Sequence, residues 1–315
     1  MKHPIFLQPI FKEKIWGGTA LRDKFHYNIP SKNTGECWAI SAHPNGQSVV
    51  SSGEFKGLSL GELWRKYPGV FGEIKQGDFP LLTKILDAKN DLSIQVHPND
   101  ENANNKENGM QGKTECWYII HCEEDSEIVL GHNANTKDEL INMIENKQWD
   151  RLLKRVKIKP GDFFYVPAGT IHSLGKGILV LETQQSSDST YRVYDYDRVD
   201  SDGNLRELHL DKAIDLTIIP HELKESRCMV LNKDEATITK FVDSEYFSVY
   251  KWKVNGFFSY TQNERFQLAS VIEGNGQIKT AGGTSLIKKG DHFILPFDLG
   301  DFEIKGNLEL IVSHP

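Results

Sequence analysis

The stretch KPGDFFYVPAGTIH, residues 159–172, combines a turn, a strand, a second turn and a histidine. The Pro-Gly-Asp triplet at 160–162 is typical of a tight turn, and the aromatic run at 163–166 is typical of a strand. The Pro-Ala-Gly triplet at 167–169 predicts a second turn that leads the chain to His172. Short strands joined in this way by tight turns predict a small β-barrel.

Three other side chains complete a metal-ligand pattern with His172. Gln95 and His97 are two residues apart in a predicted strand, so both side chains point to the same face. Glu115 opens the run 115–120, which is rich in β-formers and predicts the next inward-facing strand. Two imidazoles, a carboxylate and an amide oxygen suit Zn²⁺ and leave room for a water or a substrate oxygen. The sequence therefore predicts a metalloenzyme with one Zn²⁺ per chain.

Charge and hydropathy exclude several classes of protein. The chain has 315 residues and a formal net charge of -7, so phosphates and acidic lipids are not attracted overall. No apolar run approaches the ~18 residues of a spanning helix, and residues 1–7 are too short and polar for a signal peptide. We expect a cytoplasmic protein with no nucleic-acid or membrane partner.

The remaining pattern is mainly β, with a few short helices. Leu60 to Tyr67 predicts a short amphipathic helix that ends before Pro68. A second helix is predicted at Thr136 to Lys147, where Thr136 and Glu139 have the spacing of a capping box. Period-two alternation predicts strands at 81–86, 93–97, 115–120, 127–130, 178–182 and 191–196.

An internal repeat predicts two copies of one barrel. The run VKIKPGDFFYVP at 156–167 is echoed by LIKKGDHFILP at 286–296, a period of about 129 residues. Residues 117–131 are likewise echoed by 268–278, a predicted strand, turn and strand. Residues 296–300 contain no histidine to match His172, so the second barrel should bind no metal. We expect an N-terminal metal-binding barrel at 1–230, with an N-terminal extension and a short helical segment, and a metal-free C-terminal barrel at 231–315.

Three blocks connect these features to a family: KIWGG at 14–18, GECWAISAHP at 35–44 and LSIQVHP at 92–98. The chain resembles the cupins, and more closely the type I mannose-6-phosphate isomerases (phosphomannose isomerases), over roughly its whole length. It resembles a short two-barrel form without the large helical insertion of longer members. The resemblance implies two jelly-roll barrels and a zinc-dependent interconversion of D-mannose 6-phosphate and D-fructose 6-phosphate through a cis-enediolate.

The resemblance also implies roles for individual residues. It implies that the zinc ligands are Gln95, His97, Glu115 and His172. It implies that Arg192 and Lys113 are active-site residues and that the acidic residues Glu182 and Asp188 lie near the sugar. Lys84 and Ser93 resemble phosphate-binding positions, and Arg198 stands where the family often has a lysine. We expect Lys84, Ser93 and Arg198 to form a cationic pocket for the phosphate. Trp16 is a candidate wall of the sugar pocket. Gly112-Lys113-Thr114-Glu115 departs from the more common His-Lys-Pro-Glu, so no role carries over for a histidine before the lysine.

The chemistry of such an isomerase fits these residue types. A proton must move between adjacent carbons, so the site needs a base and a group that stabilises developing negative charge. Arg192 is always charged and suits the second role. Lys113 is the preferred base or proton relay if burial and nearby cations lower its pKa, and Glu182 and Asp188 are alternatives.

Two other functions compete with the isomerase. One is a dioxygenase of the cupin type with Fe²⁺ or Mn²⁺, and the other is a non-catalytic sugar-phosphate-binding cupin. Gln95 stands where many dioxygenase cupins have the first histidine of a His-x-His pair, which favours the isomerase. We expect a small-molecule sugar phosphate as the partner and a monomer or weak dimer in solution.

Overall fold

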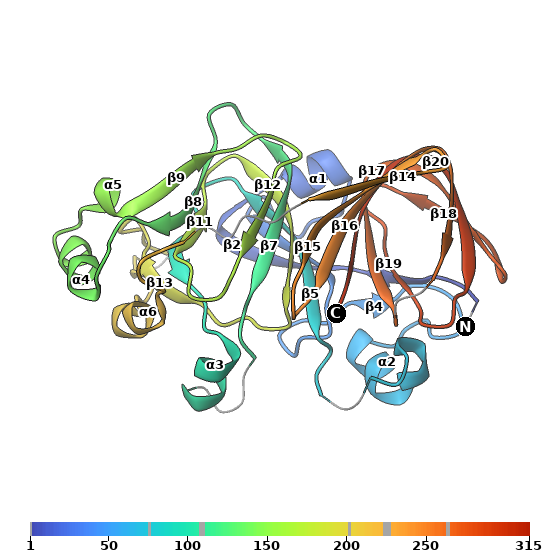
Figure 1. The fold of residues 1–315 in the computed structure, drawn as a ribbon, viewed down its shortest axis with the longest axis horizontal. Coiled ribbons are helices and arrows are strands. Elements are labelled where there is room, and N and C mark those ends of the chain that lie inside the picture. Colours follow the sequence, from blue (N-terminus) through green and yellow to red (C-terminus); the bar gives the residue numbers. More distant parts are fainter. Residues whose placement is uncertain (1, 75–76, 107–110, 201–202, 223–227, 263–264) are drawn as a thin grey trace.

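The computed structural model describes residues 2–74, 77–106, 111–200, 203–222, 228–262 and 265–315. Two β-rich units lie side by side, and short helices lie at the periphery (Figure 1). The predicted mainly β fold with few helices is confirmed. None of the helices in these ranges has the length and apolar character needed to span a bilayer.

The N-terminal unit contains two antiparallel sheets. The six-stranded sheet has the order β10-β7-β12-β5-β3-β2, with β2 Ile10–Gly18, β3 Thr34–Ile40, β5 Leu81–Ala88, β7 Glu115–Cys122, β10 Phe163–Val166 and β12 Ile178–Gln185. The five-stranded sheet has the order β13-β6-β11-β8-β9, with β6 Ile94–Val96, β8 Glu127–His132, β9 Leu153–Lys157, β11 His172–Leu174 and β13 Tyr191–Tyr194. Each strand predicted from alternation overlaps one of these.

The C-terminal unit is built on one nine-stranded sheet. Its main path is β14-β15-β16-β20-β17-β19-β1-β4, and β18 pairs with β17. The strands are β1 Ile5–Gln8, β4 Val49–Val50, β14 Met229–Lys233, β15 Ala236–Asp243, β16 Ser248–Thr261, β17 Gln267–Thr280, β18 Gly283–Lys288, β19 His292–Leu295 and β20 Asp301–His314. β1 and β4 come from the first 50 residues but belong to this sheet. The two units defined by strand pairing therefore do not separate at residue 230, where the sequence predicted the boundary.

The helices are short: α1 Ala20–Phe25, α2 Leu60–Lys66, η1 Pro68–Phe71, α3 Asp100–Lys106, α4 Lys137–Glu145, α5 Trp149–Leu152 and α6 Leu210–Leu216. At α4 the Thr136 hydroxyl accepts the Glu139 N–H at 3.2 Å, as predicted. The Glu139 carboxylate instead accepts the Asn135 N–H at 2.7 Å, so only half of the predicted capping box forms. A complete capping box, which pairs Ser59 with Glu62, begins α2.

The repeated turn has the same construction in both units. The Asp162 carboxylate accepts the Lys159 N–H at 2.9 Å, and the Asp291 carboxylate accepts the Lys288 N–H at 2.8 Å. The glycine before each aspartate has a positive φ, of 94° and 91° respectively. The second part of the repeat differs, because residues 268–278 lie within the single strand β17. A register shift at Val271 replaces the predicted turn, so that expectation is wrong.

The two units share a hydrophobic core. One cluster of buried side chains includes Ile85 and Cys116 from the first unit and Phe247 and Phe266 from the second. The Phe163 ring of β10 stacks on the Phe241 ring of β15, with ring centroids 4.6 Å apart. Because the shared cluster is buried and apolar, it holds the two units together.

Candidate metal centre and substrate cavity

Four predicted ligands from both sheets of the N-terminal unit meet at one point. Gln95 on β6 pairs with His172 on β11, and Glu115 opens β7 on the six-stranded sheet. The ligand atoms of His97, Glu115 and His172 all lie within 4.8 Å of one another. The Gln95 amide nitrogen lies 3.3 Å from His172 Nε2. The structure thus brings together the residues that the sequence pattern singled out.

The chemistry of this cluster fits a divalent metal ion. His172 Nδ1 lies 2.8 Å from the Thr170 carbonyl, so it carries the proton and Nε2 presents its lone pair to the cluster. Burial lowers the pKa of His97 to about 3 and also lowers that of His172, which keeps both rings in the neutral form that binds metals. Glu115 is fully buried, and its Oε1 accepts no hydrogen bond from the described residues.

Lys113 lies directly against these ligands. Its Nζ is 2.9 Å from Glu115 Oε2 and 2.9 Å from His97 Nε2. Burial works against the charged form, but the carboxylates of Glu115 and Glu182 outweigh it and raise the pKa of Lys113. The condition set for Lys113 as the base, a lowered pKa, is therefore not met among the described residues, because the neighbours that act on this ammonium group most strongly are anions.

A cavity of about 280 Å³ opens beside the cluster. Eight predicted site residues line it: Trp16, Lys84, Ser93, Gln95, Lys113, Glu182, Asp188 and Arg192. Its walls also include residues for which no role was predicted, among them Lys14, Glu36, Trp117, Thr190, Arg206 and His209. Glu36 and Trp117 lie in motifs or strands already noted, so only their role was missed. Arg206 and His209 follow no recognisable motif.

The two acidic residues of the cavity differ in environment. Glu182 accepts a 2.9 Å hydrogen bond from Trp117 Nε1 and lies 3.6 Å from Lys84 Nζ. Burial, followed by the charge of Glu115, raises the pKa of Glu182. Burial also acts to raise the pKa of Asp188, but Lys84 and Lys113 outweigh it and lower that pKa. Glu182 is thus the carboxyl group that is closer to protonation.

Arg192 stands on β13 opposite Gln95, so both side chains lie on the same face of the sheet. Its backbone is fixed by His209: the Arg192 N–H donates to His209 Nδ1 at 3.2 Å, and the Arg192 carbonyl accepts the His209 N–H at 2.8 Å. Its Nε is buried and has no hydrogen-bond partner among the described residues. Because Arg192 also lines the cavity, its guanidinium group is placed to donate to a molecule there.

Arg198 is not among the cavity-lining residues. Its guanidinium group bonds to the carboxylate of Asp195 and the carbonyl of Asp91, and it lies 5.3 Å from the centre of the Tyr196 ring. Arg206 reaches the cavity instead, and its Nε donates to Asp195 at 2.6 Å. The structure thus places a different arginine at the wall for which Arg198 was predicted.

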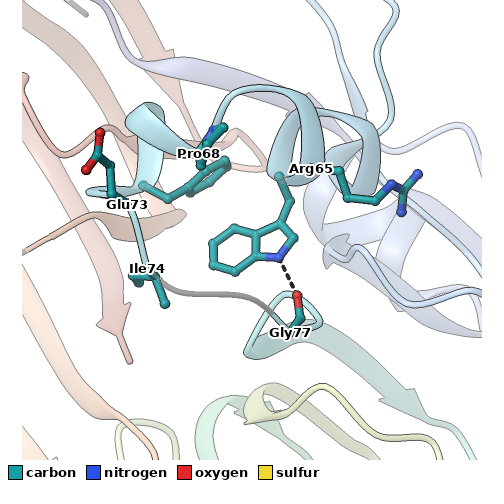
Figure 2. A pocket seen from close by; sticks show the side chains of 7 residues that line it. Arg65, Pro68, Glu73, Ile74 and Gly77 are labelled. Carbon is teal, nitrogen blue, oxygen red and sulfur yellow. Dashed lines mark hydrogen bonds between the residues drawn. The ribbon is translucent and has the colours of Figure 1, made fainter.

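A second cavity lies apart from the ligands, against α2 and η1. Figure 2 shows this cavity with Arg65, Pro68 and Gly77 on its wall. Trp64 also lines it, and its indole nitrogen donates to the Gly77 carbonyl at 2.8 Å. Its lining residues also include Phe71 and Ile74, with Arg65 and Glu73 as the charged ones. Its described lining residues include no converging set of ligands like that beside the first cavity, so we assign the chemistry to the first.

Comparison with known proteins decides the family. Residues 5–113 match the family described as phosphomannose isomerase type I, catalytic domain, and residues 237–315 match the cupin domain of mannose-6-phosphate isomerase. Mannose-6-phosphate isomerase ManA of Bacillus subtilis is 56% identical over 311 residues, which cover 99% of this chain and 98% of that protein. The chain belongs to the type I mannose-6-phosphate isomerase family.

Other members agree along the full length. The mannose-6-phosphate isomerase of Streptococcus mutans is 48% identical over 314 residues, which cover 100% of this chain and 99% of that protein. The crystal structure of the mannose 6-phosphate isomerase from Bacillus subtilis superimposes with a TM-score of 0.98 at 57% identity and covers both chains completely. The family resemblance expected from the sequence, including its short form, is confirmed.

Proposed function

We propose that the protein interconverts D-mannose 6-phosphate and D-fructose 6-phosphate with one Zn²⁺ bound by Gln95, His97, Glu115 and His172. The observation that carries this proposal is the buried His97, Glu115 and His172 cluster beside a cavity lined by lysines and arginines. A phosphate ester has close to two negative charges near neutral pH, and such cations bind it through charge-assisted bonds.

Different groups at the cavity have different roles in the proposed isomerisation. When bound, Zn²⁺ supplies a Lewis acid that polarises sugar oxygens. Arg192 donates to the oxygen on which negative charge develops as the cis-enediolate forms, since its side chain lines the cavity. Trp16 walls the cavity, and Gly35 allows this close packing, because a Cβ at Gly35 would lie 2.7 Å from the Trp16 ring.

Three groups compete to move the proton: Lys113, Glu182 and Asp188. A base works best when its pKa lies near the operating pH. The raised pKa of Glu182 brings its carboxyl group toward that range, whereas the lowered pKa of Asp188 takes it further away. Lys113 beside Glu115 is held in its charged form. Glu182 lines the cavity, and its carboxylate is oriented by the 2.9 Å hydrogen bond from Trp117 Nε1. We therefore assign proton acceptance to Glu182, and to Lys113, which also lines the cavity, the donation of a hydrogen bond to a sugar oxygen.

A coupled assay for fructose 6-phosphate, with metal analysis of the same sample, tests the proposed function. We expect turnover of mannose 6-phosphate and one zinc per chain. Metal-loaded protein that binds the sugar phosphate without converting it would indicate the non-catalytic alternative. Oxygen consumption with iron or manganese bound would indicate a dioxygenase.

Lys84 tests the need for a phosphate. Its side chain is buried, and its Nζ lies 5.0 Å from the centre of the Trp38 ring. We expect Lys84→Met, which preserves the apolar stem against Trp38, to raise KM for mannose 6-phosphate roughly 10- to 100-fold, because a charge-assisted bond is lost. The KM for free mannose, measured in parallel, should change much less, whereas kcat changes for both sugars because Lys84 Nζ lies 3.6 Å from Glu182. Equal effects on the two KM values would exclude Lys84 as a phosphate ligand.

A further inference from the structure

Arg206 lies at the cavity wall with its guanidinium group held in one orientation. Its Nε and Nη2 both donate to the carboxylate of Asp195, which is 4% exposed. A paired contact of this kind fixes the plane of the guanidinium group and leaves Nη1 unused by the pair. Arg198 bonds to the same carboxylate from outside the cavity. The buried carboxylate of Asp195 therefore orients the side chain of Arg206, which lines the cavity.

The position of Arg206 follows from the strand pairing. Tyr194 on β13 pairs with Ile94 on β6, so Asp195 leaves β13 beside Ser93. The chain then returns to β13, where the backbone of His209 bonds to that of Arg192. Arg206 and Arg192 consequently enter the same cavity from adjacent segments, and Ser93 also lines it.

The charges at this end of the cavity are unbalanced. Arg198 and Arg206 both bond to the buried carboxylate of Asp195, and Arg206 is near enough to Arg192 to lower its pKa. Asp188 and Glu207 act in the opposite direction, but the Glu207 side chain is 82% exposed and is screened by water. Two arginines that face one cavity repel each other unless an anion lies between them.

We propose that Arg206 binds the phosphate group of the substrate together with Ser93, and that Asp195 is the positioning residue that aims it. This inference rests on the proposed function and adds a specificity-determining residue to it. A fixed guanidinium fork matches phosphate oxygens in geometry as well as in charge. Arg206 thereby takes the role at the cavity that the sequence pattern suggested for Arg198.

The test uses zinc-loaded protein and two probes. One is the KM for mannose 6-phosphate, and the other is the dissociation constant of inorganic phosphate from calorimetry. We expect Arg206→Ala to raise both roughly 10- to 100-fold, as the loss of a charge-assisted bond predicts, while kcat stays within about threefold. Arg206→Gln, which preserves bulk and can still donate to Asp195, covers the case in which Arg206→Ala does not fold. Arg151→Ala on the exposed surface of α5 is the matched control.

A second arm tests the role of Asp195. Asp195→Asn should weaken phosphate binding less than Arg206→Ala, and the double variant should be no weaker than Arg206→Ala alone, because Asp195 acts through Arg206. Additive losses would overturn the positioning role.

Two further outcomes decide the proposal. Unchanged phosphate affinity in Arg206→Ala and Arg206→Gln overturns it, and so does an equal rise in KM for free mannose. If the wild type binds phosphate in an Arg206-dependent way but forms no fructose 6-phosphate, the anion site stands and the proposed isomerase activity fails.

Discussion

The two β-units share one turn but differ in what their strands enclose. Each turn has a positive-φ glycine followed by an aspartate that accepts a hydrogen bond from the backbone three residues earlier. In the first unit the chain continues to His172 and a polar cavity. In the second unit the interior is a packed apolar cluster that includes Trp252, Phe258 and Leu310. The turn therefore specifies the scaffold, and the residues beyond it specify the chemistry.

A histidine alone does not distinguish the units. His292 in the second unit is as deeply buried as His97 and His172, and its pKa is also lowered by burial, to about 3. Both of its ring nitrogens have partners, however: Ser270 Oγ lies 2.8 Å from Nδ1, and Tyr27 Oη lies 2.7 Å from Nε2. A metal site needs converging ligands with an unpaired acceptor, which the first unit provides and His292 does not.

The largest expected effect comes from removing a ligand in the first unit. We predict that His97→Ala or His172→Ala lowers kcat/KM by more than about 100-fold, the upper end of the loss caused by a partner outside the ligand set. The variants should stay folded, because the apolar clusters do not depend on the ion. Elemental analysis should find one metal per chain in the wild type and less in the variants. Two metals per chain, or active protein without metal, would contradict the contrast between the units.

The matching change in the second unit should affect stability alone. Phe258 is fully buried against Trp252, with ring centroids 5.4 Å apart. We predict that Phe258→Ala lowers the unfolding free energy by roughly 3–5 kcal/mol, because a large cavity forms. Denaturant unfolding measures this loss, and the metal content of the folded fraction should stay at that of the wild type. Loss of metal from folded Phe258→Ala protein would show that packing in the second unit affects metal binding in the first.

Local patterns predicted much of this molecule. Two-residue spacing placed Gln95 and His97 on one face, and the turn at 160–162 located His172, because both signals act within a few residues. Contacts between distant segments were not predictable in this way. The pairing of β1 with β19 joins opposite ends of the chain, and no local pattern encodes it.

Two features of the site depend on contacts that the sequence pattern does not contain. Arg206, and not Arg198, lines the cavity. Which of the two does so depends on the path of the chain between β13 and α6, and two arginines cannot be distinguished by residue type alone. The raised pKa of Lys113 depends on the carboxylates of Glu115 and Glu182, which reach it through space rather than along the chain. Spacing and the family resemblance gave candidate residues that the structure brings together, whereas only tertiary structure gave their charges and orientations.

Arg192 gives the next effect in size. We expect Arg192→Ala to lower kcat on the order of 100-fold, about 2.7 kcal/mol, as the loss of one oxyanion donor does. The effect should fall on kcat rather than on KM, because the bond strengthens as charge develops. Arg192→Lys should rescue poorly, since an ammonium group lacks the planar fork. Steady-state kinetics with mannose 6-phosphate measures this, and near-normal kcat with a raised KM would make Arg192 a substrate anchor only.

The smallest effect is a pH dependence that belongs to the second unit. Burial holds the pKa of His292 at about 3 in the folded protein, whereas an unfolded histidine titrates near 6.5. Below about pH 6.5 the unfolded chain takes up a proton that the folded protein does not, so stability falls as the pH decreases toward 3. Above pH 6.5 this contribution is constant. Between pH 7 and pH 5 the loss should be about 2 kcal/mol.

His292→Gln isolates this contribution, because glutamine can still hydrogen-bond with Ser270 or Tyr27 but does not titrate. Unfolding free energies of both proteins, measured from pH 7 to pH 5, should converge by about 2 kcal/mol as the pH falls. Contributions of the other histidines, including those of the metal site, are common to both proteins and cancel in the difference. Parallel curves would mean that His292 takes up a proton in the folded protein as it does in the unfolded chain. The contrast between His292, whose ring nitrogens both have partners, and the histidines of the metal site would then have no support from the pH dependence.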